Sequence, residues 1–369
     1  MISENKKISY LFFVIILIFV LFTNSYFDYN QSLIFGGADG ISYYEISKKS
    51  PYISDTPLKP IHAERFIFPY IIGIISKITS FDIFALYRLL DIFLIILINI
   101  LLLNILNKYD KSLLFVIFSL LLFNLNPYQT RFYIANPLII TDLFFILGSI
   151  ITIIGIDNKN KKLFFFGLLI SSLARQSSIA IIIAIFLIKF FRKDKFFLSF
   201  LNVLSSLILF ILIYLVGFTY TKMGLQDVTH SHIYFAHLFG IFVENVSIQE
   251  LFRFLTWPFL SFGPLVFFSL FFVKFNKNFI KNNFETNIFI LVFSLLIIAQ
   301  PIISGAFMTG KNIIRLSSFS FVPILIFFIK NFNFKATTNI KKTIFLIILT
   351  IWTCHPTFSK FTYLESFKF

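Results

Sequence analysis

Side chains able to do chemistry gather in one short stretch of this otherwise apolar chain. The segment "IFGGADGISYYEISKKSPY", residues 34–52, places Asp39, Tyr43, Tyr44 and Glu45 soon after an apolar run. A carboxylate can deprotonate an acceptor hydroxyl, and arginine or lysine can hold a phosphate through charge-assisted hydrogen bonds. Such groups, brought together, could stabilise the transfer of a group from a phosphate to a hydroxyl.

Further ionisable residues follow near the ends of later apolar runs. They are Asp55, His62, Glu64, Arg65, Arg88, Asp91, Arg131, Asp142, Arg175, Lys311 and Arg315. Ionisable groups at membrane depth are costly, so they usually pair, line a cavity or act in function. We therefore treat these residues as candidates for one site, and ask which elements would position them.

The composition indicates a membrane protein. Of the 369 residues, 58% are hydrophobic and 13% are charged, and the mean hydropathy is +0.88. Apolar runs of about 18 residues or more recur along the chain, long enough to cross a ~30 Å hydrocarbon core as helices. The sequence predicts an all-α integral membrane protein with about 11 transmembrane helices.

We expect one polytopic membrane domain over residues 1–369, with a core in residues 1–200 and additional transmembrane helices in residues 201–369. The first apolar run follows Lys6 and Lys7 and lacks a convincing cleavage site, so we interpret it as a retained span. The expected spans are 8–22, 83–106, 113–125, 137–156, 163–174, 177–191, 196–219, 256–273, 286–305, 313–329 and 343–354.

The basic residues predict the orientation. With the N-terminus inside, the cytoplasmic segments hold 18 of the 32 lysines and arginines and only 5 of the 17 acidic residues. This asymmetry follows the positive-inside rule and places the loop 25–82, which contains Asp39, on the outer face. The basic charge is dispersed over juxtamembrane loops, so a nucleic-acid partner is not expected.

Several candidates also have a structural interpretation. Asp39 could cap a helix that begins near Ile41, and Arg88 could form an ion pair with Asp91 one turn away. Asp142 could likewise pair with Arg131. Tyr43 and Tyr44 fit an interfacial aromatic belt, and arginines such as Arg175 can extend to the membrane interface.

No metal or cofactor is expected. The segment "HSHIYFAH" contains His230, His232 and His237, but this spacing matches no familiar zinc pattern. The single cysteine, Cys354, allows no internal disulfide.

The order of these features resembles a known superfamily. Asp39-Gly40-Ile41-Ser42-Tyr43-Tyr44, Pro57-Leu58-Lys59-Pro60 and "RFIFPYIIGIISKITSFDIFALYRLL" look like the first outer loop of the GT-C polyprenyl-phosphate-dependent glycosyltransferases. The branch most similar is that of protein mannosyltransferases and aminoarabinose transferases. "ANPLIITDLFFILGSI" and "LLISSLARQSSIAIII" are similar to the family's later segments with an outward acidic and a basic residue. The resemblance covers roughly residues 8–200.

The resemblance implies a polyprenyl-phosphate sugar donor and a lipid or glycan acceptor on the periplasmic face of a bacterial inner membrane. It implies Asp39 as general base and a catalytic role for Asp142. The expected substrate-binding residues are Arg65, Arg88, Arg131, Arg175, Arg315, Lys311, Tyr43 and Tyr44. Two alternatives stay open: an O-antigen polymerase or ligase, and a polytopic transporter or flippase, although no internal repeat favours a transporter.

Overall fold

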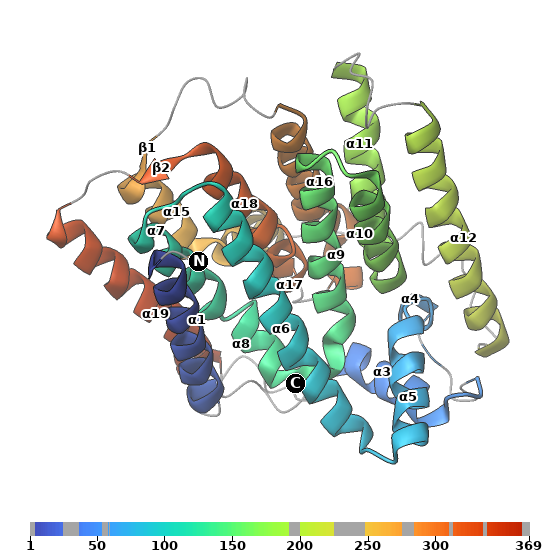
Figure 1. The fold of residues 1–369 in the computed structure, drawn as a ribbon. Coiled ribbons are helices and arrows are strands. Elements are labelled where there is room, and N and C mark those ends of the chain that lie inside the picture. The colour runs from blue at the N-terminus through green and yellow to red at the C-terminus, as the bar shows by residue number, and fades with distance from the viewer. Residues whose placement is uncertain are drawn as a thin grey trace.

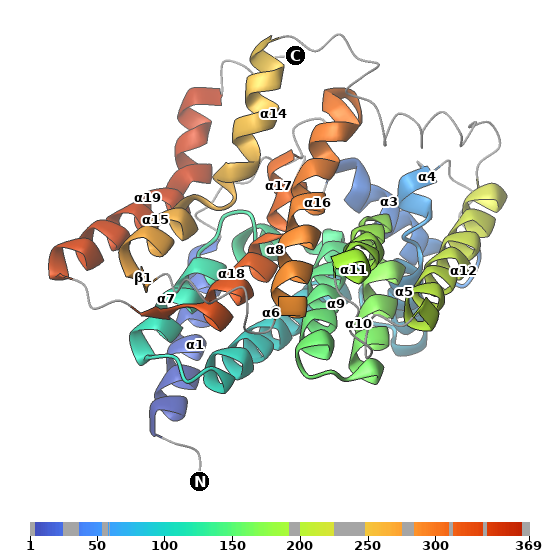
Figure 2. The ribbon, with the colours of Figure 1, turned by 90° about the horizontal axis from the view of Figure 1, so that it is seen from above.

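The chain folds into a bundle of helices (Figures 1 and 2). The computed structural model describes residues 4–24, 37–53, 58, 60–191, 200–224, 248–274, 284–309, 313–334 and 338–363. Its helices are α1 (Glu4–Thr23), α3 (Gly37–Lys49), α4 (Pro60–Ala63), α5 (Ile67–Thr79), α6 (Ile83–Lys108), α7 (Leu113–Asn124), α8 (Thr130–Ala135), η2 (Pro137–Ile139), α9 (Ile140–Asp157), α10 (Lys161–Ala174), η3 (Gln176–Ser178), α11 (Ile179–Phe191), α12 (Phe200–Gly224), α14 (Ile248–Leu260), α15 (Gly263–Phe272), α16 (Phe284–Thr309), α17 (Ile313–Ser318), α18 (Phe321–Asn331) and α19 (Asn339–Tyr363). Two short strands, β1 (Val273–Lys274) and β2 (Asn333–Phe334), pair antiparallel.

The predicted membrane character is confirmed. Five helical segments of the described chain are long and apolar enough to cross a bilayer: Lys6–Thr23, Ile83–Lys108, Pro137–Asp157, Phe284–Ser304 and Ile313–Asn331. Every expected span overlaps a helix, but the total of about 11 stays a prediction because several of these helices are short. The expected run 256–273 is divided, since α14 ends at Leu260 and α15 begins at Gly263.

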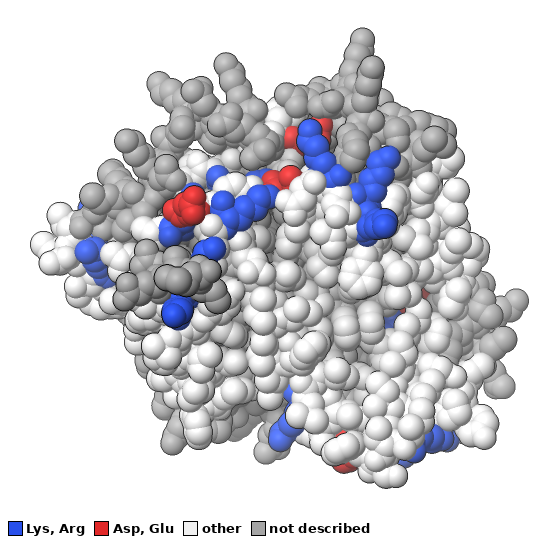
Figure 3. All heavy atoms as spheres, viewed as in Figure 1, with Lys and Arg blue, Asp and Glu red and all other residues white. Residues whose placement is uncertain are grey.

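An uncharged belt surrounds the bundle on the face seen in Figure 3, with charged side chains gathered above and below it. Large apolar side chains are exposed on several helices, for example Leu11 on α1, Phe166 on α10 and Leu212 on α12, each more than half exposed. Contiguous apolar surface of this extent is rare on soluble monomers. Such an apolar surface is expected where the helices face lipid.

Side-chain caps set where two of the helices begin. The Asp82 carboxylate accepts a hydrogen bond from the Ala85 backbone N–H at 2.9 Å, and the Asn160 amide oxygen accepts one from Leu163 at 3.2 Å. Each cap satisfies a backbone donor that the first turn of a helix leaves free. The helices α6 and α10 therefore start immediately after these residues.

Glycines let α9 and α10 pack backbone against backbone. A Cβ atom added to Gly148 would lie 2.4 Å from Ser171 Oγ, and one added to Gly167 would lie 2.5 Å from the Thr152 nitrogen. Small residues at such contacts allow close approach of membrane helices. Because the two helices are antiparallel neighbours, the start of α9 and the end of α10 meet at the same end of the bundle.

The helices α3, α4 and α5 lie together at that end, beside α12 (Figures 1 and 2). The Ser47 hydroxyl on α3 donates to the Pro69 carbonyl at 2.7 Å and lies 2.8 Å from the Tyr87 hydroxyl on α6. A Cβ atom on Gly73 of α5 would lie only 2.1 Å from the Ser47 carbonyl. These contacts fix α3 against both α5 and α6.

A lysine cluster marks the opposite end. Asp157 at the end of α9 pairs with Lys108 at 2.6 Å and also with Lys330, and it accepts a hydrogen bond from the Tyr109 hydroxyl at 2.8 Å. Asp142 and Asp157 share one helix, so about 22 Å separates them along its axis. The two charged ends are thus far enough apart to lie on opposite membrane faces.

We expect Lys48 to lie outside the cell and Lys159 inside, because both are exposed and belong to opposite ends of the bundle. Single cysteines placed at these two positions in a Cys354→Ser background should test this. A membrane-impermeant maleimide should label Lys48→Cys in intact spheroplasts and Lys159→Cys only after lysis. Labelling of Lys159→Cys before lysis would reverse the orientation.

Candidate functional site

Arg315 of α17 joins two aspartates that are distant in sequence. Its Nη2 donates to Asp39 Oδ2 on α3 at 2.7 Å, and its Nε lies 3.5 Å from Asp142 Oδ2 on α9. The Asp142 side chain is fully buried, and only 9% of the Arg315 side chain and 15% of the Asp39 side chain are exposed. This guanidinium therefore ties α3 to the start of α9.

Asp39 is held on both of its oxygens. The His62 ring lies with Nε2 2.8 Å from Oδ1, and the other ring nitrogen lies 2.9 Å from the Ser42 hydroxyl. The helix α3 begins at Gly37, so Asp39 lies in its first turn, where a negative charge is favourable. The expected helix start near Ile41, with Asp39 as its cap, is wrong, because the first turn already contains Asp39.

Asp142 forms an ion pair with Arg175. The Arg175 Nη1 donates to Asp142 Oδ1, and the guanidinium also lies over the Phe319 ring, 4.8 Å from its centroid. Arg175 occupies the extended junction between α10 and η3. The alternative pairing of Asp142 with Arg131 is wrong, since Arg131 Nη2 instead donates to Thr23 on α1 at 3.0 Å.

A third guanidinium, that of Arg65, continues the network. Its Nε donates to the Gln176 amide oxygen at 2.8 Å, and its Nη1 donates to the Tyr43 hydroxyl at 3.3 Å. Gln176 Nε2 in turn donates to Glu64 Oε2 at 2.5 Å. Tyr43 is fully buried, so it belongs to this network and not to an interfacial belt.

These residues form what we call the arginine–carboxylate cluster. Its members are Asp39, Tyr43, His62, Glu64, Arg65, Asp142, Arg175, Gln176 and Arg315. They come from α3, α4, the turn after α4, the start of α9, the junction before α11, and α17. Packing of α9 against α10 and of α3 against α5 and α6 brings most of these elements to one end of the molecule.

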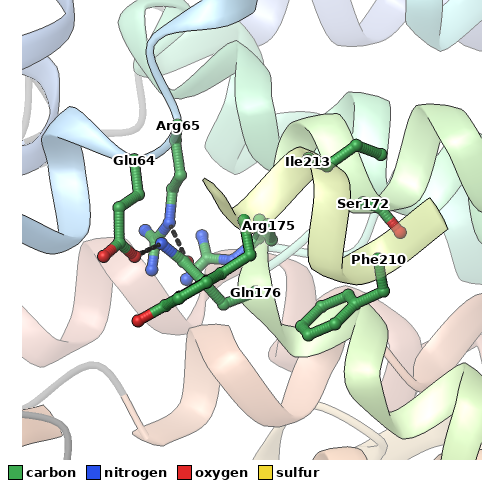
Figure 4. A pocket seen from close by; sticks show the side chains of 8 residues that line it. Glu64, Arg65, Ser172, Arg175, Gln176, Phe210 and Ile213 are labelled. Atoms are coloured by element: carbon green, nitrogen blue, oxygen red, sulfur yellow. Dashed lines mark hydrogen bonds between the residues drawn. The ribbon is translucent and has the colours of Figure 1, made fainter. Parts of the chain in front are cut away.

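A small pocket opens beside the cluster (Figure 4). Its polar wall is made by Glu64, Arg65, Ser172, Arg175 and Gln176, and its apolar wall by residues of α12. The α12 residues are Phe210, Ile213 and Tyr214. The cavity volume of about 20 Å³ gives room for roughly one water molecule.

The electrostatic environment shifts the pKa values of Asp39 and Glu64 in opposite directions. Burial alone would raise the pKa of Asp39, but Arg315, His62 and Arg65 together outweigh it and hold the pKa well below its ordinary value. Glu64 lacks a comparable set of cations. Burial raises its pKa to about 6, although the hydrogen bond from Gln176 and the charge of Arg65 partly oppose the rise.

Polar atoms within the cluster are left without hydrogen-bond partners among the described residues. They are Glu64 Oε1, Asp142 Oδ2, Arg175 Nε, Arg315 Nε and, on the pocket wall, Ser172 Oγ. Buried polar atoms are normally hydrogen-bonded, so such a concentration indicates a place for water or a polar ligand. The three guanidiniums also exceed the two aspartates by one positive charge, before Glu64 is counted.

The remaining expected residues do not join the cluster through any contact of the described chain. Arg88 is exposed, lies 4.7 Å from the centroid of the Phe84 ring, and makes no ion pair with Asp91. Tyr44 is half-buried, and Arg131 contacts α1. Lys311 and the histidine segment 230–237 lie outside the described residues.

The sequence placed His62 and Glu64 among the candidate ionisable groups without a specific role, and it did not single out Gln176. All three flank an expected arginine: His62 and Glu64 lie within three residues of Arg65, and Gln176 follows Arg175. Their proximity to those arginines was the available signal. Among the described residues, no group of three or more His, Cys, Asp and Glu is arranged to hold a metal ion.

Comparison with known proteins gave no match: neither a family, nor a curated protein, nor a solved structure is detectably similar to this chain.

The raised pKa of Glu64 predicts a pH dependence of stability. A carboxyl group whose pKa is higher in the folded protein stabilises the fold at low pH and less so once it ionises. Between pH 4.5, its ordinary pKa, and about 6, the folded value, the free energy of unfolding should therefore fall as pH rises. The loss attributable to Glu64 should be on the order of 2 kcal/mol.

SDS-induced unfolding of the purified protein at pH 4.5 to 7.5 measures this. Glu64→Gln should remove that part of the slope, while Glu45→Gln, a half-buried carboxylate on the same outer segment, should retain it. An unchanged slope in Glu64→Gln would show that Glu64 titrates normally.

Proposed function

We propose that the protein is a membrane glycosyltransferase that moves a sugar from a polyprenyl-phosphate donor to a hydroxyl of a lipid or polysaccharide acceptor. The observation that carries the proposal is the convergence of Arg65, Arg175 and Arg315 with the largely buried Asp39 and the fully buried Asp142 at one end of a membrane bundle. Arginine is suited to phosphate because its planar fork can donate two parallel hydrogen bonds.

Charge favours a monoanionic ligand. With Glu64 protonated, the three guanidiniums exceed the two aspartates by one positive charge, which matches the one negative charge of the phosphodiester that links sugar and polyprenyl chain in such donors. Once Glu64 ionises, the cluster has no excess charge, and the guanidiniums then hold the phosphate by charge-assisted hydrogen bonds. The Arg175 Nε atom, which has no hydrogen-bond partner within the described chain, is a donor that a phosphate oxygen could satisfy. An ion of this kind would lower the cost of burying the excess charge.

The apolar wall of the pocket suits the polyprenyl chain. Leu207, Ile211 and Leu215 on α12 are between 39% and 51% exposed, so the helix that lines the pocket also presents an apolar outer surface. We expect the tail to lie along α12 with its phosphate at Arg65 and Arg175. The pocket must widen for this, and the Phe210 and Tyr214 side chains are the part of its wall that can move without breaking an ion pair of the cluster.

The reaction needs no nucleotide. The acceptor oxygen forms a bond to the anomeric carbon while the bond from that carbon to the phosphate oxygen breaks. The bonding electron pair leaves with the polyprenyl phosphate, whose charge the guanidiniums stabilise. The acceptor proton passes to a carboxylate, the role that the sequence predicts for Asp39.

We place the reaction on the periplasmic face of a bacterial inner membrane, with the N-terminus in the cytoplasm. Two features support this placement. The cluster lies at the end opposite to Asp157 and its lysines, and lysine-rich ends face the cytoplasm. The donor would reach the pocket from the bilayer, and the acceptor from the aqueous side.

The test is a transfer assay with purified protein in proteoliposomes. Undecaprenyl phosphate carrying radiolabelled glucose, mannose, galactose or arabinose is supplied together with a lipid extract of the envelope, and labelled products are separated. Wild-type protein should transfer label from at least one donor. No transfer from any of them would contradict the proposal.

The variant Arg175→Lys tests phosphate binding by Arg175 in the same assay. Lysine keeps the charge beside Asp142 but loses the planar fork that can donate two parallel hydrogen bonds. We expect the donor KM to rise by about tenfold or more with smaller change in kcat, at unchanged protein abundance. An unchanged donor KM would exclude Arg175 from phosphate binding.

A further inference from the structure

We propose that Glu64 is the carboxylate that takes the proton from the acceptor hydroxyl. The inference rests on the proposed glycosyl transfer and gives the role of general base to Glu64 in place of Asp39. It arises from the pocket and its hydrogen bonds, since the motif around Asp39 gives no reason to select Glu64.

One carboxylate oxygen of Glu64 is held by a hydrogen bond, and the other makes none within the described chain. Its side chain lines the pocket together with Arg65 and Arg175, and the residue is 9% exposed. Gln176 fixes one carboxylate oxygen, Oε2, at 2.5 Å, whereas Oε1 has no hydrogen-bond partner among the described residues. A base needs this combination: an orientation held by one atom, and a second atom free to meet the substrate.

Asp39 has the opposite arrangement. His62 occupies its Oδ1 at 2.8 Å and Arg315 occupies its Oδ2 at 2.7 Å. A proton on Asp39 would neutralise the carboxylate that faces Arg315 and so weaken this ion pair. Its geometry suits a different task, which is to hold Arg315 and His62 in place within the cluster.

Charged and polar groups from three parts of the fold surround Glu64. Arg65 follows it in the chain, Arg175 and Gln176 face it from the junction before α11, and Tyr214 faces it from α12. His62 precedes it on α4 but is bound between Ser42 and Asp39. Burial places the pKa of Glu64 at about 6, near the pH at which a periplasmic base would operate, whereas that of Asp39 is held far lower.

The proposed step moves one glycosyl group and one proton. As the acceptor oxygen bonds to the anomeric carbon, its proton passes to Glu64 Oε1. The carbon–oxygen bond to phosphate breaks, and polyprenyl phosphate leaves with the electron pair toward Arg65 and Arg175. Glu64 then returns its proton to water, and the step needs no oxidant or reductant.

The experiment compares steady-state kinetics of Glu64→Gln and wild type in proteoliposomes, with the radiolabelled undecaprenyl-phosphate sugar that wild type uses. Glutamine can still accept the hydrogen bond from Gln176 but cannot take a proton. We expect kcat to fall by about 10²- to 10⁴-fold, with the donor KM changed by less than about threefold. Glu45→Gln is the matched control and should retain wild-type kcat.

The pH profile gives the second readout. In wild type, kcat/KM should rise through a limb near pH 6 as Glu64 ionises. The limb should be absent from the residual activity of Glu64→Gln and should persist in His62→Asn, which excludes the neighbouring histidine as its source. If Glu64→Gln accumulates poorly, Glu64→Asp serves instead, and should lose kcat while keeping a pH limb.

Three results would overturn the inference. Near-normal kcat with an intact pH limb in Glu64→Gln would leave the transferase standing but remove Glu64 as its base. A raised donor KM with unchanged kcat would make Glu64 a positioning residue for Arg65. Absence of transfer by wild type from every donor would remove the proposed function, and the role of Glu64 with it.

Discussion

The contact of Arg315 with Asp39 and Asp142 is the constraint on which the candidate site depends. It joins residues 276 positions apart in the chain, and it links the outer helix α3 to the core helix α9. Breaking a buried ion pair by removing one partner is strongly destabilising, because the remaining charge keeps its desolvation cost. Most of the cluster therefore comes from the N-terminal half of the chain, and the C-terminal half contributes the guanidinium of Arg315 that joins its two aspartates.

The packing of the bundle explains how costly charges come to share one end. The glycine contacts between α9 and α10 set the distance between Asp142 and Arg175, and Ser47 with Tyr87 fixes α3 near both. Membrane helices gain little from hydrophobic burial against one another, so close backbone contact and hydrogen bonds carry more of their association. The same contacts that stabilise the bundle thus position the cluster.

Much of this arrangement could be predicted from the sequence, for physical reasons. The helices follow from long apolar runs, and Asp39, Asp142, Arg65, Arg175 and Arg315 stand out because ionisable groups are expensive near lipid. Their pairing could not be predicted, since it depends on how each helix is rotated about its axis. For that reason Asp142 was open to pairing with Arg131, Arg88 with Asp91, and Glu64 and Gln176 gained no role until the turns that carry them were seen together.

The central claim is that the arginine–carboxylate cluster binds a lipid-linked phosphate, and a binding comparison by native mass spectrometry tests it most directly. Wild-type protein should retain undecaprenyl phosphate at least about tenfold more tightly than undecaprenol, which shares the tail but lacks the charge. Arg65→Gln should lose this preference, whereas Lys108→Gln, in the lysine cluster at the opposite end, should keep it. Equal retention of the two lipids by wild type, or loss of the preference only in Lys108→Gln, would contradict the account.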